Sequence, residues 1–379
     1  AEASAADPLA AARPLRPAAR FATAIAATVE PGRAPPPRAT AWGGTRTRGV
    51  KPWARRCRRG PPTRAGTSPL GTSTTAGRSP TVTRGHADGR RGGTPEGQGG
   101  WGTARALPRA AGVRAPEVLA HEPGEGFLLL SDLGDTLLLG ALGEDTVEAL
   151  YRTALDTLLA IQGAAIQHGG WRAPDYSAAL LEQEMALFPE WYLQGLLGLE
   201  PDAGERRMLR DLFECLGASA LEQPQVLVHR DYHSRNLMLQ PDGTLGVIDF
   251  QDAVRGPLTY DLVSLLRDCY IEWPAARVQA WARGYAGRAS AAGLMAPVEA
   301  ATFRRWFDWM GLQRHIKVLG IFARLWLRDG KRGYLADLPL VMRYTLGVAE
   351  AYPELGEFAG WFRARVLPLA AAQDWYRPR

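Results

Sequence analysis

The sequence predicts an α+β fold in which a mostly helical region is built around one short β segment. Three apolar runs, Val226–Val228, Leu237–Leu239 and Leu245–Ile248, have the length of strands. The last two are separated by Gln240–Gly243, which contains the Pro, Asp and Gly of a tight turn. On both sides of this segment, apolar residues recur with the period of amphipathic helices.

The β segment carries three polar residues, Asp231, Asn236 and Asp249, at positions expected to lie in loops. Phosphoryl transfer requires a carboxylate that accepts the proton of the attacking hydroxyl, and oxygen ligands that hold Mg²⁺ on the phosphates of ATP. Asp231 is therefore a candidate base, and Asn236 and Asp249 are candidate metal ligands. Asp and Asn also populate ordinary turns, but the compound pattern with His229 and the hairpin disfavours that interpretation.

Two motifs, His229–Asn236 and Ile248–Phe250, resemble the catalytic and metal-binding loops of the protein-kinase-like superfamily. His233 stands where protein kinases carry Lys, which is a feature of the aminoglycoside phosphotransferase and choline kinase branch that phosphorylates small molecules. Only eleven residues separate Asp249 from Asp261, which leaves no room for a long activation loop. The resemblance implies a protein-kinase-like fold that uses ATP and Mg²⁺.

Residues 1–103 differ in composition from the rest of the chain. They contain 16 Arg and one Lys against five acidic residues, and they show no sustained helical or strand period. A nucleic-acid-binding tail, a transit peptide and plain disorder are possible interpretations. We favour an out-of-frame translation of GC-rich DNA, because the whole chain has three Lys against 42 Arg. No nucleic-acid partner is therefore expected.

Residues 104–134 are expected to be the remnant of a truncated or degenerate small lobe. Ala104–Gly112 has the character of a helix end, whereas Val113–Ala120 and Gly126–Gly134 have the character of strands.

The resemblance implies that Ser131, Asp132 and Leu133 form a hinge whose backbone holds adenine, and an ordinary hairpin is the alternative. The preceding segment has Lys51 as its only Lys, followed by Pro52, and no apolar run beside it. We therefore expect no functional small lobe there, and we expect the chain as written to be a poor kinase.

Residues 135–379 are expected to form the helical large lobe, which carries the catalytic and substrate-binding residues. Helices are predicted at Glu144–Ile161, Leu180–Leu187, Arg206–Leu221, Tyr260–Cys269, Ala275–Ala291, Val298–Leu327 and Leu338–Ala351. Aromatic residues on the late helices are expected in the core, namely Trp281, Trp306, Phe307, Trp309 and Trp326. The chain contains no run of eighteen apolar residues and no secretory hydrophobic segment at its start. No membrane association is expected, and the expected location is the cytoplasm.

Three further stretches sharpen the resemblance: Met185–Tyr192, Asp249–Pro257 and Leu312–Phe322 are similar to the anomeric amino-sugar kinases. These enzymes use ATP to phosphorylate C1 of N-acetylmuramate or N-acetylglucosamine in bacterial cell-wall recycling. The resemblance implies a small-molecule sugar partner. An aminoglycoside or choline-type kinase, and an inactive kinase-like binding protein without a small lobe, remain the alternatives. No pattern in the sequence specifies an oligomeric state.

Candidate substrate-binding residues follow from this resemblance. A lactyl carboxylate or an N-acetyl group requires Arg or amide donors, and Arg314, His315 and Lys317 stand together on a predicted helix. A solvated helix face is the alternative for these three. The residues that are candidates for shaping the sugar pocket are Trp171, Tyr176, Glu184 and Trp191.

Three residues are expected to support the catalytic loop rather than to react. His229 and His233 are expected to be packed, hydrogen-bonded braces. Asp261 is expected to cap its helix and, by the resemblance, to brace the catalytic loop.

Overall fold

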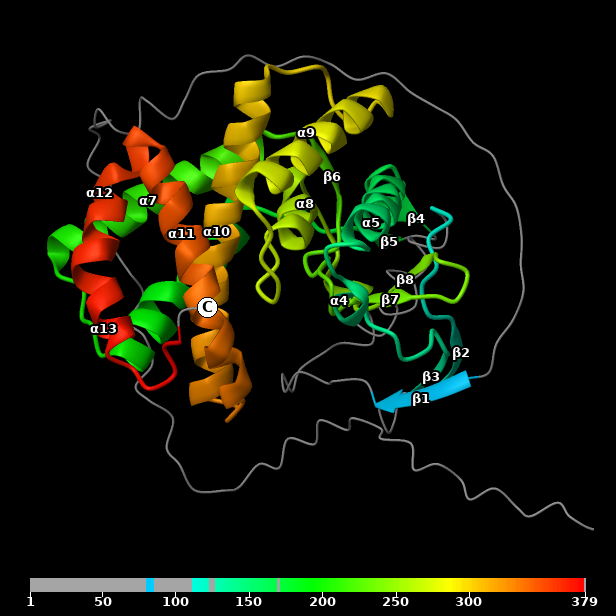
Figure 1. Ribbon diagram of the computed structural model, residues 1–379, viewed down its shortest axis with the longest axis horizontal. Coiled ribbons are helices and arrows are strands. Elements are labelled where there is room, and N and C mark those ends of the chain that lie inside the picture. Colours follow the sequence, from blue (N-terminus) through cyan, green and yellow to red (C-terminus); the bar gives the residue numbers. More distant parts are fainter. Residues whose placement is uncertain (1–79, 85–110, 123–126, 169–170, 378–379) are drawn as a thin grey trace, which may run out of the picture. The chain divides into compact units, whose positions relative to one another are not determined.

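The computed structural model describes residues 80–84, 111–122, 127–168 and 171–377 (Figure 1). Apart from Pro80–Arg84, the expectations for residues 1–103 therefore lie outside the described residues. The same holds for most of the helix end predicted at Ala104–Gly112. The proposed division at residues 103 and 134 stays a prediction.

The first sheet is antiparallel and has the strand order β1-β3-β2. It consists of β1 (Pro80–Arg84), β2 (Val118–Glu122) and β3 (Phe127–Ser131), and β3 confirms the second strand predicted in this region.

The first predicted strand begins later than expected, at Val118 instead of Val113. Val113 and Ala115 are buried in the core, and Arg114 between them forms a parallel bridge with Gly246. The carbonyl oxygen of Arg114 accepts the N–H of Val247 at 2.8 Å. This stretch is therefore joined to the strands of the β segment instead of to the first sheet.

The β segment forms two antiparallel pairs. The hairpin joins β7 (Leu237–Leu239) to β8 (Leu245–Val247), and β6 (Gln225–Val228) pairs with β9 (Val254–Pro257). The turn of the hairpin contains Gly243 at φ 78°, a conformation that favours glycine. The three strands predicted in this segment are confirmed, whereas β9 was not anticipated because Val-Arg-Gly-Pro lacks an alternating pattern.

Helices make up most of the remaining described structure, and all seven predicted helices are confirmed. Their bounds, with those of the shorter elements, are α4 (Leu138–Ala141), α5 (Val147–Gln162), β4 (Gln167–His168), β5 (Trp171–Arg172), α6 (Ala178–Met185), the π-helical turn η2 (Phe188–Leu196), α7 (Ala203–Glu222), α8 (Thr259–Leu266), α9 (Ala275–Ala291), α10 (Ala300–Leu327), α11 (Leu338–Ala351), α12 (Gly356–Trp361) and α13 (Leu367–Ala371). Helix α7 starts at a capping box, in which Asp202 and Glu205 each accept the other's backbone N–H.

Helix α10 is the central element of the helical part, and it packs against α6, η2, α7, α8, α9 and α11 (Figure 1). Its contact with the end of α6 depends on Gly320. A Cβ atom at this position would lie 2.4 Å from the backbone carbon of Leu187. The absence of a side chain therefore lets the two segments approach closely.

The core contains the aromatic residues expected there. Trp306, Phe307 and Trp309 are buried, and Trp281 and Trp326 are partly buried and pack against the same core.

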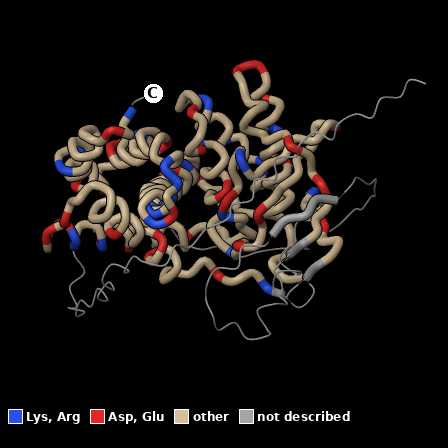
Figure 2. Tube along the Cα trace, turned by 90° about the horizontal axis from the view of Figure 1, so that it is seen from below, with Lys and Arg blue, Asp and Glu red and all other residues tan. Residues whose placement is uncertain are grey.

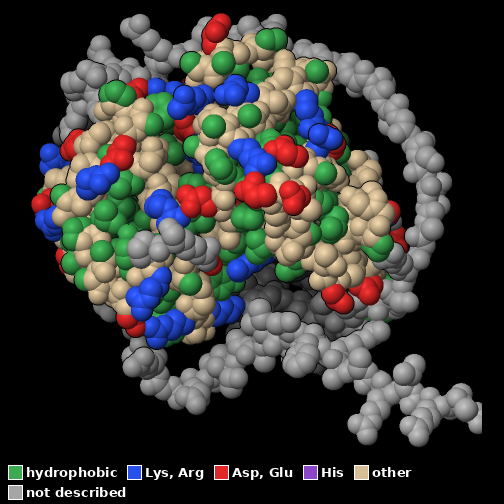
Figure 3. All heavy atoms as spheres, viewed as in Figure 1, with side chains coloured by type: hydrophobic (Ala, Val, Ile, Leu, Met, Phe, Trp, Pro, Cys, Tyr) green, Lys and Arg blue, Asp and Glu red, His purple; other side chains and the backbone are tan. Residues whose placement is uncertain are grey.

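Basic and acidic residues are both distributed over the described elements (Figure 2), and both kinds of side chain lie among hydrophobic ones on the face shown in Figure 3. Among the described helices, none is both long and apolar enough to cross a membrane.

Candidate functional site

The loop after β6 and the loop after β8 hold the three predicted polar residues. Two non-glycine residues of these loops, Arg230 at φ 75° and Asp249 at φ 72°, have left-handed backbone conformations. Such conformations are uncommon for residues with a side chain, and they persist where the surrounding structure enforces them. They mark both loops as constrained.

Asp261 on α8 provides one of these constraints. Its carboxylate accepts the backbone N–H of His229 at 2.7 Å and that of Arg230 at 3.0 Å. Asp261 does not cap α8, because the helix begins after Leu258 without a side-chain cap. Burial raises the pKa of Asp261 to about 7, although the two N–H donors act in the opposite direction.

His229 joins the two loops. Its Nδ1 accepts the backbone N–H of Asp231 at 3.2 Å, so its Nε2 carries the proton and donates to the carbonyl of Ile248 at 2.9 Å. Burial lowers the pKa of His229 to about 4, so the ring is neutral at pH 7. The ring also packs edge-on against Phe250, with centroids 4.3 Å apart.

Asp231 lies half-buried between the braced loop and α10. Burial opposes its ionisation, but the positive charge of Lys317, followed by His233 and Arg314, outweighs this and lowers the pKa of its carboxyl. Asp231 is therefore a carboxylate at neutral pH, in the state needed to accept a proton.

Asn236 is hydrogen-bonded both to the backbone of Asp231 and to the residue that precedes Asp249. The side-chain amide of Asn236 donates to the carbonyl of Asp231 at 3.0 Å, which directs its Oδ1 away from that contact. The backbone carbonyl of Asn236 accepts the N–H of Ile248 at 3.1 Å, which ties the two loops together. Asp249 is exposed, and one of its oxygens accepts the amide of Gln251. Amide and carboxylate oxygens are the ligand types that suit Mg²⁺.

Glu184 is the centre of a buried polar cluster behind the catalytic loop. One of its oxygens accepts Arg230 and also Lys317 at 2.9 Å, and the other accepts the hydroxyl of Tyr176. Lys317 also donates to the hydroxyl of Tyr260 at 2.9 Å. Burial raises the pKa of Glu184, but the two cations outweigh it, so the net shift is downward.

Three of the predicted substrate residues, Tyr176, Glu184 and Lys317, are thus brought together, mainly by contacts with one another. Arg230 and Tyr260 complete this cluster, and neither was predicted from the sequence as a site residue. The position of Arg230 directly before the candidate base was the one available signal.

The other predicted residues occupy separate places. His315 is fully buried and faces away from the loop, with Nε2 at 3.1 Å from the carbonyl of Arg267 and its ring stacked on Tyr344. Trp191 is partly buried against the core, and the backbone of Trp171 pairs with that of His168 in β4 and β5.

The predicted support residue His233 packs edge-on against Tyr270, and the Nδ1 of this ring has no partner among the described residues. Arg314 is buried on α10, one turn before Lys317.

The residues predicted to form the hinge, Ser131, Asp132 and Leu133, lie where the first sheet continues into the helical part. Ser131 exchanges hydrogen bonds with the backbone of Glu117, Asp132 accepts the N–H of Gly134, and the carbonyl of Leu133 accepts Gln240 at 2.6 Å.

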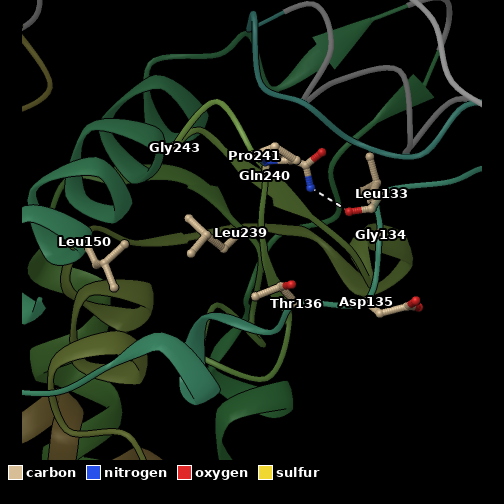
Figure 4. A pocket seen from close by; sticks show the side chains of 9 residues that line it. All are labelled: Leu133, Gly134, Asp135, Thr136, Leu150, Leu239, Gln240, Pro241 and Gly243. Atoms are coloured by element: carbon tan, nitrogen blue, oxygen red, sulfur yellow. Dashed lines mark hydrogen bonds between the residues drawn. The ribbon is translucent and has the colours of Figure 1, made fainter.

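A cavity of about 500 Å³ adjoins this hinge (Figure 4). Its lining residues are Leu133, Gly134, Asp135, Thr136, Leu150, Leu239, Gln240, Pro241 and Gly243. The lining does not include Asp231, Asn236 or Asp249, so this cavity is separate from the proposed reaction centre.

The chain is similar to several known proteins. The sequence profile described as the phosphotransferase enzyme family matches residues 103–294, a span that includes Asp231, Asn236 and Asp249. A curated N-acetylmuramate/N-acetylglucosamine kinase of Pseudomonas aeruginosa is 44% identical over 251 residues, which are 66% of this chain and 73% of that protein. A protein of the same name from Neisseria meningitidis is 43% identical over 64% of this chain and 73% of its own length. A solved choline/ethanolamine kinase family protein from Mesorhizobium loti overlaps 69% of this chain and 81% of its own, but its TM-score of 0.46 and 16% identity are too low to carry an inference.

Proposed function

Because the chain belongs to the phosphotransferase enzyme family, we propose that it transfers a phosphoryl group from ATP to the C1 hydroxyl of N-acetylmuramate or N-acetylglucosamine. The observation that carries this proposal is the braced loop of Asp231, to which Asn236 and the loop of Asp249 are tied by hydrogen bonds. The acceptor is inferred from relatives that are 43% and 44% identical and carry the names of these sugars.

In the proposed reaction, the oxygen of the sugar C1 hydroxyl attacks the γ-phosphorus of ATP, and the carboxylate of Asp231 accepts the proton of that hydroxyl. A new O–P bond forms at the sugar, the bond to the β-phosphate oxygen breaks, and ADP leaves. Such reactions depend mainly on positioning and charge stabilisation. Asp261 and His229 supply the positioning of Asp231, because they accept the backbone N–H groups of the turn that leads into it and of Asp231 itself.

The oxygens near Asp231 fit a divalent cation that prefers hard ligands. We infer that Asn236 and Asp249 hold Mg²⁺, which when bound neutralises charge on the β- and γ-phosphates. Arg230 and Lys317 add positive charge nearby, since both act on Asp252 next to Asp249.

We also infer that the hinge contacts adenine through the backbone around Asp132 and Leu133. The carbonyl of Leu133 is already bound by Gln240. The N–H of Leu133 is therefore the more suitable group for this contact, because it has no hydrogen-bond partner among the described residues.

The direct test is phosphorylation of the two sugars with ATP and Mg²⁺, followed by ³¹P NMR to detect an anomeric phosphate. Choline and kanamycin serve as competing acceptors. The chain as written is compared with a version in which residues 1–103 have been frame-corrected. We expect sugar 1-phosphate from the corrected version and little from the chain as written. Phosphorylation of choline or kanamycin alone would show that the sugar assignment is wrong.

A further inference from the structure

Arg314 is a buried cation without a carboxylate partner in the described part of the chain. Its side chain lies on α10, and the residue is 4% exposed. Two other arginines near the catalytic loop are each paired, Arg230 with Glu184 and Arg267 with Asp308. Among the described residues, no carboxylate oxygen lies within ion-pair distance of Arg314.

The contacts that Arg314 makes with other described residues do not include a hydrogen bond to an anion. Its Nη1 lies 3.5 Å from the Sγ of Cys269, and its Nε has no partner among the described residues. Burial raises the pKa of the Cys269 thiol to about 11, so the sulfur is neutral at pH 7. Arg remains protonated in proteins, and buried charges are normally paired. An anion supplied by a ligand would complete this environment.

The contacts of Arg314 place it beside the catalytic loop. Its neighbour Cys269 follows Asp268, which accepts the hydroxyl of Ser234 in that loop. Cys269 also precedes Tyr270, whose ring packs against His233. The charge of Arg314 lowers the pKa of Asp231, the proposed base. Near Asp249, other cations are present, because Asp252 interacts there with the charges of Arg230 and Lys317. The acceptor hydroxyl has to lie next to Asp231, since this residue takes its proton.

The neighbours of Arg314 on α10 are not available for the same task. Lys317 is held by Glu184 and Tyr260, and His315 faces the opposite side, toward Arg267. Arg314 is therefore the cation on this helix that, unlike Lys317, has no ion-pair partner within the described structure.

We propose that Arg314 binds the carboxylate of N-acetylmuramate and thereby determines the preference between the two sugars. This inference rests on the proposed function. The sugars share the ring, the acetamide and the C1 hydroxyl, and N-acetylmuramate differs by a lactyl ether that ends in a carboxylate. A guanidinium can bind a carboxylate through two parallel hydrogen bonds, which an ammonium or imidazole cannot reproduce.

The test is sugar binding by isothermal titration calorimetry in the presence of ADP and Mg²⁺, which does not require turnover. The ligands are N-acetylmuramate, its methyl ester and N-acetylglucosamine. The ester keeps the shape of the lactyl group but removes its charge. We expect the unchanged chain to bind N-acetylmuramate at least about tenfold more tightly than the ester, because hydrogen bonds to charged groups are the stronger ones.

Variants of Arg314 then separate the carboxylate contact from a general loss of structure. Arg314→Gln should bind all three ligands with similar affinity, because the cation is lost while binding of the ester is retained. Arg314→Lys should recover part of the preference. If Arg314→Gln keeps the full preference, or loses all three ligands equally, this inference is overturned while the proposed function stands. If neither the unchanged chain nor the frame-corrected version binds either sugar, both are overturned.

Stability gives a second measurement with a matched control. Arg314→Met removes a buried charge that has no carboxylate partner, so the free energy of unfolding should stay the same or increase. Arg267→Met removes the buried ion-pair partner of Asp308 and should decrease the free energy of unfolding. Equal losses in urea denaturation of the two variants would show that Arg314 is a structural cation and would overturn the inference.

Discussion

The carboxylate of Asp261 accepts the backbone N–H of His229 at 2.7 Å, although the two residues are 32 positions apart in the sequence. The same carboxylate accepts the N–H of Arg230, so one buried side chain fixes the turn that leads into Asp231. The position of the proposed base therefore depends on a residue of the following helix.

Replacement of Asp261 by Asn should destabilise the protein in a pH-dependent way. At pH 8 the carboxylate accepts two N–H groups, whereas Asn has one acceptor oxygen, so the free energy of unfolding should fall by about 1–3 kcal/mol. Because the pKa of Asp261 is raised to about 7, above its value in the unfolded chain, the folded chain takes up a proton below this pH and the unfolded chain does not. The original protein should therefore gain about 1 kcal/mol between pH 8 and pH 6 that the Asn variant does not gain, so the difference between the two proteins should grow at pH 6.

Urea denaturation at pH 8 and pH 6 measures this effect. Ser264→Ala on the same helix is the control, since the Ser264 hydroxyl is buried without a partner among the described residues. An equal loss at both pH values would contradict the raised pKa of the Asp261 carboxyl.

Asp231→Asn should abolish sugar phosphorylation in the frame-corrected protein, because the amide cannot accept the proton. The loss of a general base typically lowers the rate by about 10²–10⁴-fold. Binding of Mg-ATP should be largely kept, whereas Asp249→Asn should weaken it. Turnover assays and calorimetric titration with a non-hydrolysable ATP analogue distinguish the two effects. If the Asp231→Asn variant kept most of its turnover, another residue would have to be the base.

Glu184→Gln should strongly destabilise the folded chain. The change leaves Arg230 and Lys317 without their shared carboxylate, and breaking a buried ion pair in this way costs about 3–5 kcal/mol. Glu182→Gln, an exposed position on the same helix, should have little effect. Chemical denaturation of the two variants at pH 7 provides the comparison, and similar curves would argue against Glu184 as the centre of the cluster.

Gly320→Ala should destabilise the packing of α10 against the end of α6. The added Cβ would lie 2.4 Å from a backbone atom of Leu187, so the elements must move apart, and overpacking of this kind typically costs about 1–3 kcal/mol or more. Gly347 lies exposed in α11 with nothing within 4 Å of an added Cβ. Gly347→Ala should instead stabilise its helix by about 1 kcal/mol. Thermal unfolding should thus shift in opposite directions, and a shift in the same direction would refute the close contact.

His315→Gln should make stability less sensitive to acid. Burial lowers the pKa of His315 to about 3, with Arg314 adding to the effect, so the folded chain binds fewer protons than the unfolded chain below pH 6.5. Stability contributed by this residue is complete above pH 6.5 and is lost as the pH falls. Between pH 7 and pH 5 the original chain should lose about 2 kcal/mol more than the variant. The exposed residue His168 offers the control His168→Gln, and parallel curves for all three proteins would disprove the effect.

The sequence by itself determined the fold class, the helices and the catalytic segment, because these depend on local patterns. The apolar period of α5 and the turn at Gln240–Gly243 are set by neighbouring residues, and the bounds of α9 and α11 were predicted to the residue. The spacing of Asp231, Asn236 and Asp249 is likewise a local property of one hairpin.

Only the tertiary structure decided which distant groups meet and which remain unpaired. Glu184 and Lys317 are 133 positions apart and contact each other because α10 packs against α6. The same packing directs Arg314 toward Cys269 and His315 toward the carbonyl of Arg267, although the two are adjacent in sequence. Sequence spacing does not contain this information, because the orientation of a helix about its axis is fixed by what packs against each of its faces.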